Sequence, residues 1–97
     1  MMITTVASAG SLESGDVLIS ISPANVGRKI ELNSSVYKQF GEDILKSVNE
    51  ILDEYEVKNA TIKIEDKGAL DLVIRARLKT AIFRASLKDY NWENELC

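Results

Sequence analysis

The chain has 97 residues, of which 45% are apolar and 28% are charged, and its formal net charge at pH 7 is −3. These values are typical of one globular domain with a single core, and they do not predict binding to nucleic acid or to an anionic membrane. The sequence has no histidine and one cysteine, Cys97, which excludes Ser–His and Cys–His nucleophilic pairs and the usual zinc and copper ligand sets. The chain is therefore not expected to be an enzyme on its own.

The sequence predicts a cytoplasmic protein. Its N-terminus lacks the basic flank and the long apolar region of a secretory signal. No apolar run approaches the roughly 20 residues that cross a bilayer. Cys97 has no second cysteine with which to form an internal disulfide, which favours a reducing compartment.

The first third of the chain is typical of β-strands. Small and β-branched residues over 3–13 predict a first strand, and apolar residues over 17–22 predict a second, which ends at Pro23 because proline cannot donate to a sheet. Charged and apolar residues alternate over 28–33 and predict a third strand. Because the connections are short, we expect these three strands to form an antiparallel meander.

The connection between the first two strands runs from Gly10 to Asp16 with the sequence Gly-Ser-Leu-Glu-Ser-Gly-Asp. Its Ser14-Gly15 pair predicts a tight two-residue hairpin turn, since glycine adopts the positive φ that such a turn requires. That geometry would expose the Ser14 hydroxyl to another molecule. Turn serines are common, however, so spacing alone favours an ordinary solvated turn.

A long amphipathic helix is expected to follow the third strand. Apolar residues recur at intervals of three and four, at Val36, Phe40, Ile44, Val48, Ile51, Leu52 and Tyr55. This spacing predicts about five helical turns that end near residues 54–57. The preceding Asn33-Ser34-Ser35 offers side-chain oxygens for the N-cap.

A fourth strand and a second helix complete the predicted elements. Apolar and polar residues alternate over 60–65, and residues 69–85 fit both strand and helix spacing. About seventeen residues without a breaker, rich in Ala, Leu and Arg, favour the helix, with Asp66 as its cap. The polar tail over 86–97 either frays or docks through Trp92.

These elements predict an α+β domain over residues 1–97 with the order β-β-β-α-β-α. The expected architecture is a two-layer sandwich, in which two helices cover one face of a four-stranded, mainly antiparallel sheet. The other face of the sheet would have to be polar or be covered by a partner.

Charge is distributed unevenly between the two predicted helices. Residues 67–88 contain six basic residues and one acid, whereas residues 36–56 contain six acids and two bases. Two solvated helix faces that complement each other are the favoured interpretation. The alternative is a basic patch for phosphate-bearing or acidic partners, because arginine binds such groups bidentately.

Six short motifs are spread over nearly the whole chain up to residue 86. They are Ala9-Gly10-Ser11-Leu12-Glu13-Ser14-Gly15-Asp16-Val17, Asn33-Ser34-Ser35-Val36, Gln39-Phe40-Gly41, Asp66-Lys67-Gly68-Ala69-Leu70-Asp71, Ile74-Arg75-Ala76-Arg77 and Arg84-Ala85. Together and in this order, the motifs resemble the acyl carrier protein, or gamma, subunit of citrate lyase. The common four-helix acyl carrier fold does not fit, since its modified serine lies in an Asp-Ser-Leu motif that this sequence lacks.

The resemblance implies a carrier without catalysis of its own. In that family, the serine of the Leu-Glu-Ser-Gly-Asp turn carries 2'-(5''-phosphoribosyl)-3'-dephospho-coenzyme A through a phosphodiester, and here this serine is Ser14. The terminal thiol of the group holds acetyl as a thioester. An alpha subunit exchanges acetyl for citrate, and a beta subunit cleaves the citryl thioester to oxaloacetate during citrate fermentation. A transferase attaches the group.

The resemblance also suggests which residues partners would recognise. The candidates are Glu13, Gly15, Asp16, Arg75 and Arg77. For Glu13 and Asp16 two interpretations have equal weight. The transferase recognises them, or they merely keep the turn solvated. The two arginines would meet the phosphates of the arm or an acidic patch on a lyase subunit. No catalytic residue and no metal ligand is expected.

Two alternatives remain open at this point. The carrier subunit of citramalate lyase uses the same kind of arm and would be chemically interchangeable. A small interaction module that carries nothing would instead dock through the basic last helix or the open face of the sheet. Replacing Ser14 with alanine separates a carrier from such a module, because only the carrier would lose its function.

Overall fold

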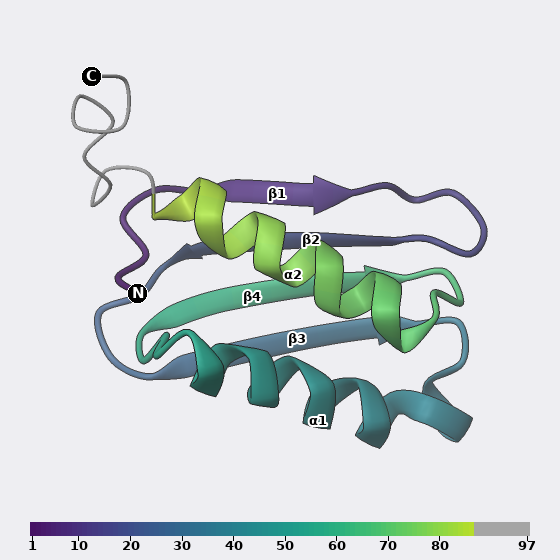
Figure 1. Cartoon of the computed structure of the whole chain (residues 1–97). Coiled ribbons are helices and arrows are strands. Elements are labelled where there is room, and N and C mark those ends of the chain that lie inside the picture. Colours follow the sequence, from purple (N-terminus) through teal and green to yellow (C-terminus); the bar gives the residue numbers. More distant parts are fainter. Residues whose placement is uncertain (87–97) are drawn as a thin grey trace.

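The computed structural model describes residues 1–86, which form one sheet and two helices. The elements are β1 (Ala7–Gly10), β2 (Val17–Pro23), β3 (Arg28–Ser34), α1 (Tyr37–Glu54), β4 (Ala60–Asp66) and α2 (Asp71–Ala85). Both helices lie on the same face of the four-stranded sheet (Figure 1). The predicted α+β class and element order are therefore confirmed. Except for Ser86, the predicted tail lies outside the described residues.

The order of the strands corrects the predicted meander. The sheet has the order β1-β2-β4-β3, so β4 lies between β2 and β3. β2 pairs antiparallel with β1 and with β4, whereas β3 pairs parallel with β4. The expectation that the first three strands pair in sequence is wrong for β3, which forms an edge of the sheet.

The length of the chain explains how the short β2–β3 connection can pass the end of β4, which lies between these two strands. The β2–β3 connection spans residues 24–27, and four extended residues reach up to about 14 Å. Two strand spacings amount to only about 9.6 Å. The parallel β3–β4 pair is made possible by α1, which crosses back over the sheet as such pairs require. The alternation of charged and apolar residues within β3 predicts which face of the strand is solvated. It does not predict which strand pairs with β3.

The core lies between the sheet and the two helices. Its largest fully buried side chains come from β2, β4, α1 and α2, and include Ile19, Ile21, Ile62, Ile64, Val48, Ile51, Leu52, Ile74, Leu78 and Ile82. The opposite face of the sheet is polar. One row of paired residues there consists of Ser20, Lys63 and Glu31. No helix within residues 1–86 is long and apolar enough to span a membrane.

Asp66 joins the end of the sheet to the loop before α2. Its carboxylate is 1% exposed and accepts hydrogen bonds from the Ser34 hydroxyl at 2.7 Å and from the Ala69 N–H at 2.9 Å. The N-cap of α2 is Leu70, so the prediction that Asp66 caps this helix is wrong. Asp66 instead fixes the β4–α2 connection, residues 67–70, against the end of β3. This connection is the support of the candidate site.

The predicted cap of α1 also differs from the structure. Its N-cap is Val36, which makes no side-chain cap hydrogen bond. The Ser34 hydroxyl instead accepts a hydrogen bond from the Val36 N–H at 3.1 Å. At the same end of α1, Phe40 is 52% exposed, although it belongs to the apolar stripe predicted for this helix. The buried part of the stripe therefore begins at Ile44.

Candidate functional site

The β1–β2 connection is a six-residue loop rather than the predicted two-residue turn. β1 ends at Gly10 and β2 begins at Val17. Within the loop, the Asp16 N–H donates to the Glu13 carbonyl at 3.0 Å and closes a four-residue turn. Ser14 and Gly15 are the central residues of this turn, and Gly15 has a φ of +83°. Glycine is favoured there because this φ lies in the left-handed region.

Asp16 holds the loop together through both of its carboxylate oxygens. Oδ2 accepts from the Ser11 hydroxyl, and Oδ1 accepts from the Val17 N–H, each at 2.7 Å. Arg77 of α2 donates to the same oxygens at 3.2 and 3.3 Å. The Ser11 hydrogen bond first, and then the Val17 N–H and Arg77, lower the pKa of Asp16 from 3.8 to about 2. Asp16 is therefore an ionised anchor between the hairpin and α2.

The tip of the loop is also fixed to the β4–α2 connection. The Gly15 N–H donates to the Lys67 carbonyl at 2.8 Å, and the Lys67 N–H donates to the Asp16 carbonyl at 2.9 Å. Ser14 is exposed, and its hydroxyl makes no hydrogen bond with residues 1–86. Figure 1 shows this loop at the same end of the molecule as the β4–α2 connection and the start of α1. The Ser14 hydroxyl is thus exposed on a turn that backbone hydrogen bonds hold against the β4–α2 connection.

Asp16→Asn is expected to lower thermal stability at neutral pH and to loosen the loop. Because folding depresses the pKa of Asp16, the carboxylate stabilises the fold above about pH 4, and this contribution is lost as the pH falls through about 2. The difference in melting temperature between the wild type and Asp16→Asn should therefore shrink as the pH falls over that range. Thermal melts followed by circular dichroism measure this difference.

Glu13→Gln is the matched control for this pH dependence. Glu13 belongs to the same turn and is exposed, and its carboxylate has no hydrogen bond or ion pair within residues 1–86. Its melting temperature should follow that of the wild type at every pH. A stability difference for Asp16→Asn that stayed constant from neutral pH to about pH 2 would contradict the anchoring role.

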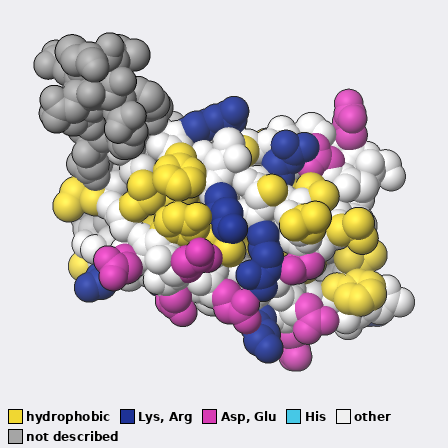
Figure 2. All heavy atoms as spheres, viewed as in Figure 1, with side chains coloured by type: hydrophobic (Ala, Val, Ile, Leu, Met, Phe, Trp, Pro, Cys, Tyr) yellow, Lys and Arg dark blue, Asp and Glu magenta, His cyan; other side chains and the backbone are white. Residues whose placement is uncertain are grey.

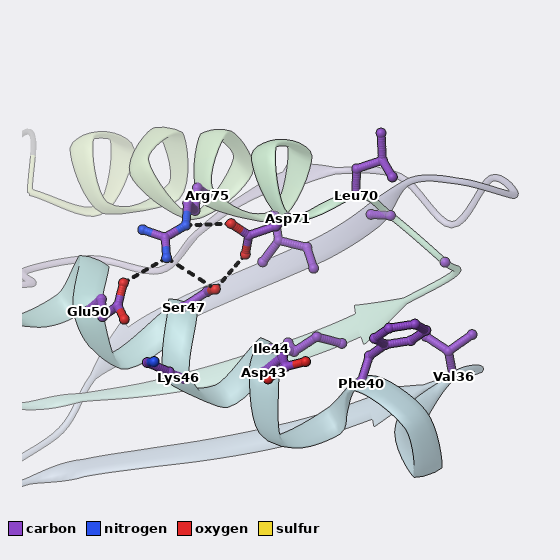
Figure 3. A pocket seen from close by; sticks show the side chains of 13 residues that line it. Val36, Phe40, Asp43, Ile44, Lys46, Ser47, Glu50, Leu70, Asp71 and Arg75 are labelled. Atoms are coloured by element: carbon purple, nitrogen blue, oxygen red, sulfur yellow. Dashed lines mark hydrogen bonds and ion pairs between the residues drawn. The ribbon is translucent and has the colours of Figure 1, made fainter.

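Arg75 lies on another side of α2 and joins the two helices (Figure 3). Its guanidinium contacts Glu50 of α1 and Asp71 of α2, both at 2.7 Å, and donates to the Ser47 hydroxyl at 3.2 Å. Ser47 in turn donates to Asp71. This hydrogen bond, and then Arg75, lower the pKa of Asp71, while Glu50 and Asp71 raise the pKa of Arg75.

The structure therefore separates the two predicted arginines. Arg77 meets the Ser14 loop through Asp16, whereas Arg75 meets α1. The Arg75–Glu50 pair supports the interpretation that the basic and acidic helix faces complement each other. Glu13, Ser14, Gly15 and Asp16 are brought together in one turn.

Sequence reasoning missed a groove between α1 and α2. It has a volume of about 510 Å³, and its lining comes from α1, from the N-cap of α1, from the β4–α2 connection and from α2. Apolar members of the lining are Val36, Phe40, Ile44, Ala69, Leu70 and Ile74. Figure 3 shows Val36, Phe40 and Leu70 toward one end of the groove and the Arg75 cluster toward the other. Phe40 belongs to the apolar stripe predicted for α1, yet its side chain is exposed. This exposure indicates where the groove lies.

Residues 1–86 contain neither a cluster of metal-ligating side chains nor a side chain hydrogen-bonded to the Ser14 hydroxyl. Within residues 1–86, no three carboxylate or thiol side chains come together in a way that could hold a metal ion. No carboxylate of the same residues is hydrogen-bonded to the Ser14 hydroxyl.

Comparison with known proteins gives matches over nearly the whole described chain. Residues 4–85 match the family described as the malonate decarboxylase delta subunit (MdcD). The citrate lyase acyl carrier protein of Haemophilus ducreyi is 57% identical over 96 residues, which cover 99% of this chain and 100% of that protein. The citrate lyase acyl carrier protein of Lactococcus lactis is 52% identical over 86 residues, covering 88% and 90% of the two chains.

A solved structure has the same fold. It is a chain of a Pseudomonas malonate decarboxylase hetero-tetramer in complex with malonate, with a TM-score of 0.72 and 21% sequence identity. The likeness covers 86% of each chain. At this identity the comparison supports the two-layer architecture alone.

Proposed function

Because this chain belongs to the family of citrate lyase acyl carrier proteins and malonate decarboxylase delta subunits, we propose that it carries acyl groups on a prosthetic group attached to Ser14. The observation that carries this assignment is the exposed Ser14 hydroxyl, which lies at the centre of a turn whose backbone is bonded to the β4–α2 connection. The role is that of a carrier subunit, and catalysis belongs to its partners.

The surroundings of Ser14 fit a covalent anchor. Its hydroxyl makes no hydrogen bond that attachment would break, within residues 1–86. The turn is supported on one side by Asp16 and Arg77 and on the other by Lys67. A transferase therefore meets a turn whose shape is set before it binds, which reduces the ordering cost of recognition.

The group proposed for this anchor is 2'-(5''-phosphoribosyl)-3'-dephospho-coenzyme A, joined through a phosphodiester to Ser14, as the resemblance of the sequence motifs to the citrate lyase family implies. When bound, the group supplies a terminal thiol that holds the acyl group as a thioester. The chain contributes a fixed attachment point, so that the length of the tether sets the concentration of the acyl group at each partner's active site.

The neighbouring residues take different parts in this proposal. Glu13 and Gly15 present the turn to the transferase. Asp16 and Arg77 hold it in shape, since their charged groups form an ion pair with each other. Arg75 is bonded to Glu50 and Asp71 and stabilises the helix pair; a recognition role for it would use the part of its side chain that stays exposed.

The proposed partners are the alpha and beta subunits of a cytoplasmic citrate lyase and the transferase that attaches the group. The names of the closely similar relatives from Haemophilus and Lactococcus support citrate as the acid that is cleaved. Citramalate lyase is the competing complex, because its carrier would offer the same thiol.

Reconstitution tests the proposed function and the choice of acid together. A mixture of the loaded carrier with the alpha and beta subunits is expected to convert citrate to oxaloacetate and acetate. A coupled assay that reduces oxaloacetate measures this conversion. Unloaded carrier should give only background. Cleavage of citramalate in preference to citrate would contradict the citrate assignment, and equal activity of loaded and unloaded carrier would contradict the carrier role.

An interaction module that carries nothing has less support. The open face of the sheet is polar, and within residues 1–86 both Arg75 and Arg77 are engaged in ion pairs of the chain itself. The polar face of the sheet therefore needs no apolar partner, and these two arginines are already paired within the chain.

A further inference from the structure

We propose that the groove between α1 and α2 is a resting site for the thiol-bearing end of the arm on Ser14; this inference rests on the proposed function. The groove has a volume of about 510 Å³, within the range of about 300–1,000 Å³ that is usual for small-molecule sites. It is a hollow between two helices, where such sites occur often. Its occupant is a segment covalently attached to the same protein.

The groove begins beside the attachment turn. Gly15 is bonded to the Lys67 carbonyl at 2.8 Å, and the next three residues, 68–70, all line the groove. With consecutive Cα atoms 3.8 Å apart, Leu70 lies at most about 11 Å along the chain from Lys67. An arm that starts on Ser14 therefore starts close to the end of the groove that residues 68–70 form.

The lining suits an arm with apolar segments between amides. The part formed by Val36, Phe40, Ile44 and Leu70 is apolar (Figure 3). Phe40 is 52% exposed and Leu70 is 75% exposed, so both would lose contact with water when the groove is filled. Figure 2 shows apolar side chains on the surface at this end of the molecule, beyond the charged side chains that cross its middle.

The Arg75 cluster limits the other end of the groove. Ser47, Asp71, Glu50 and Arg75 line it and are bonded to one another. These paired groups favour a neutral occupant over a charged one at that end, because a further charge would compete with bonds already made. A neutral acetyl thioester meets this condition.

The tether makes weak binding sufficient. A short flexible tether gives an effective concentration on the order of 1 mM, so a groove with an intrinsic Kd of about 1 mM would be occupied about half of the time. Weak binding is also required, since partner subunits must withdraw the arm. The groove is therefore a resting site and not a tight pocket.

Methyl NMR spectra of unloaded and acetyl-loaded carrier test this proposal. We expect the Ile44 and Ile74 methyl signals to shift on loading, because both residues line the groove. Leu70→Ser should at least halve these shifts, while serine remains a good N-cap for α2. Leu72→Ser is the matched control: Leu72 is 77% exposed on the same helix but does not line the groove.

A probe that is not attached to Ser14 tests binding in the groove independently of the proposed function. S-Acetyl-pantetheine titrated into Ser14→Ala protein should shift the same methyl signals with a Kd on the order of 1 mM. If no adduct forms on Ser14 in the native host, the carrier proposal fails, but this titration still decides whether the groove binds such an arm. Absence of saturable shifts overturns the resting site. Signals that respond only to an added lyase subunit overturn it too, since the groove would then be a partner contact.

Discussion

Ser14→Ala is expected to reduce citrate cleavage in the reconstituted mixture to background while leaving the fold unchanged. In the proposed function, the hydroxyl that the substitution removes is the attachment point, so no acyl group would be presented to the partners. Ser14 is exposed and its hydroxyl makes no hydrogen bond within residues 1–86, so the free energy of unfolding should change by less than about 0.5 kcal/mol. Oxaloacetate formation and a thermal melt measure the two effects.

Ser35→Ala is the control for this experiment. Ser35 is another exposed loop serine, and its substitution should leave oxaloacetate formation intact. A module that carries nothing predicts the reverse pattern, in which Ser14→Ala is active and charge reversal at Arg75 and Arg77 abolishes partner binding. Full activity of Ser14→Ala would therefore refute the carrier.

Gly10→Ala is expected to cause the larger loss of stability of the two glycine-to-alanine substitutions in the hairpin, at Gly10 and Gly15. Gly10 has a φ of +95°, and a Cβ on it would lie 1.8 Å from the Val17 carbonyl oxygen. The backbone of both strands would have to move apart at the start of the loop. We expect the free energy of unfolding to fall by roughly 2–4 kcal/mol and the melting temperature to fall by at least about 10 °C.

Gly27→Ala separates the clash at Gly10 from the cost of a positive φ. Gly27 has a φ of +77°, but apart from Gly27 and its two chain neighbours no heavy atom of residues 1–86 lies within 4 Å of the position of its added Cβ. Its substitution should cost only about 1–2 kcal/mol. Equal melting temperatures for the two variants would mean that the close approach of Gly10 and Val17 does not constrain the hairpin.

The sequence predicted the elements well because their periodicities report burial directly. Apolar spacing in α1 and alternation in β2 and β4 correspond to side chains that the core covers. Strand neighbours were not predictable in the same way. The alternation of β3 is the same whether it pairs with β2 or with β4, and only the crossover through α1 decides that β3 lies parallel to β4.

Local turn signals predicted the exposed Ser14 but not how its loop is held. The positive φ of Gly15 follows from the Ser-Gly pair, whereas the support from Lys67 and Arg77 depends on residues more than fifty positions away. The predictions of the two helix N-caps were wrong for a similar reason. Ser34 and Asp66 were predicted as caps from local sequence, but they bond to each other where β3 and β4 end side by side.

The groove could not be predicted from any single stretch of sequence. Its lining comes from α1, α2 and the β4–α2 connection, which only the fold brings together. Phe40 and Leu70 looked like ordinary members of apolar patterns. Both side chains are exposed in the lining of the groove, which distinguishes them from core residues.

The most direct test of the carrier role is the mass of the protein purified from its native host during growth on citrate. A peptide that contains Ser14 is expected to carry a large nucleotide-containing adduct, and fragmentation should place the adduct on the Ser14 oxygen. Protein made without the attaching enzymes is the unmodified reference. An unmodified Ser14 peptide in the protein from citrate-grown cells, or an adduct on another residue, would contradict the account.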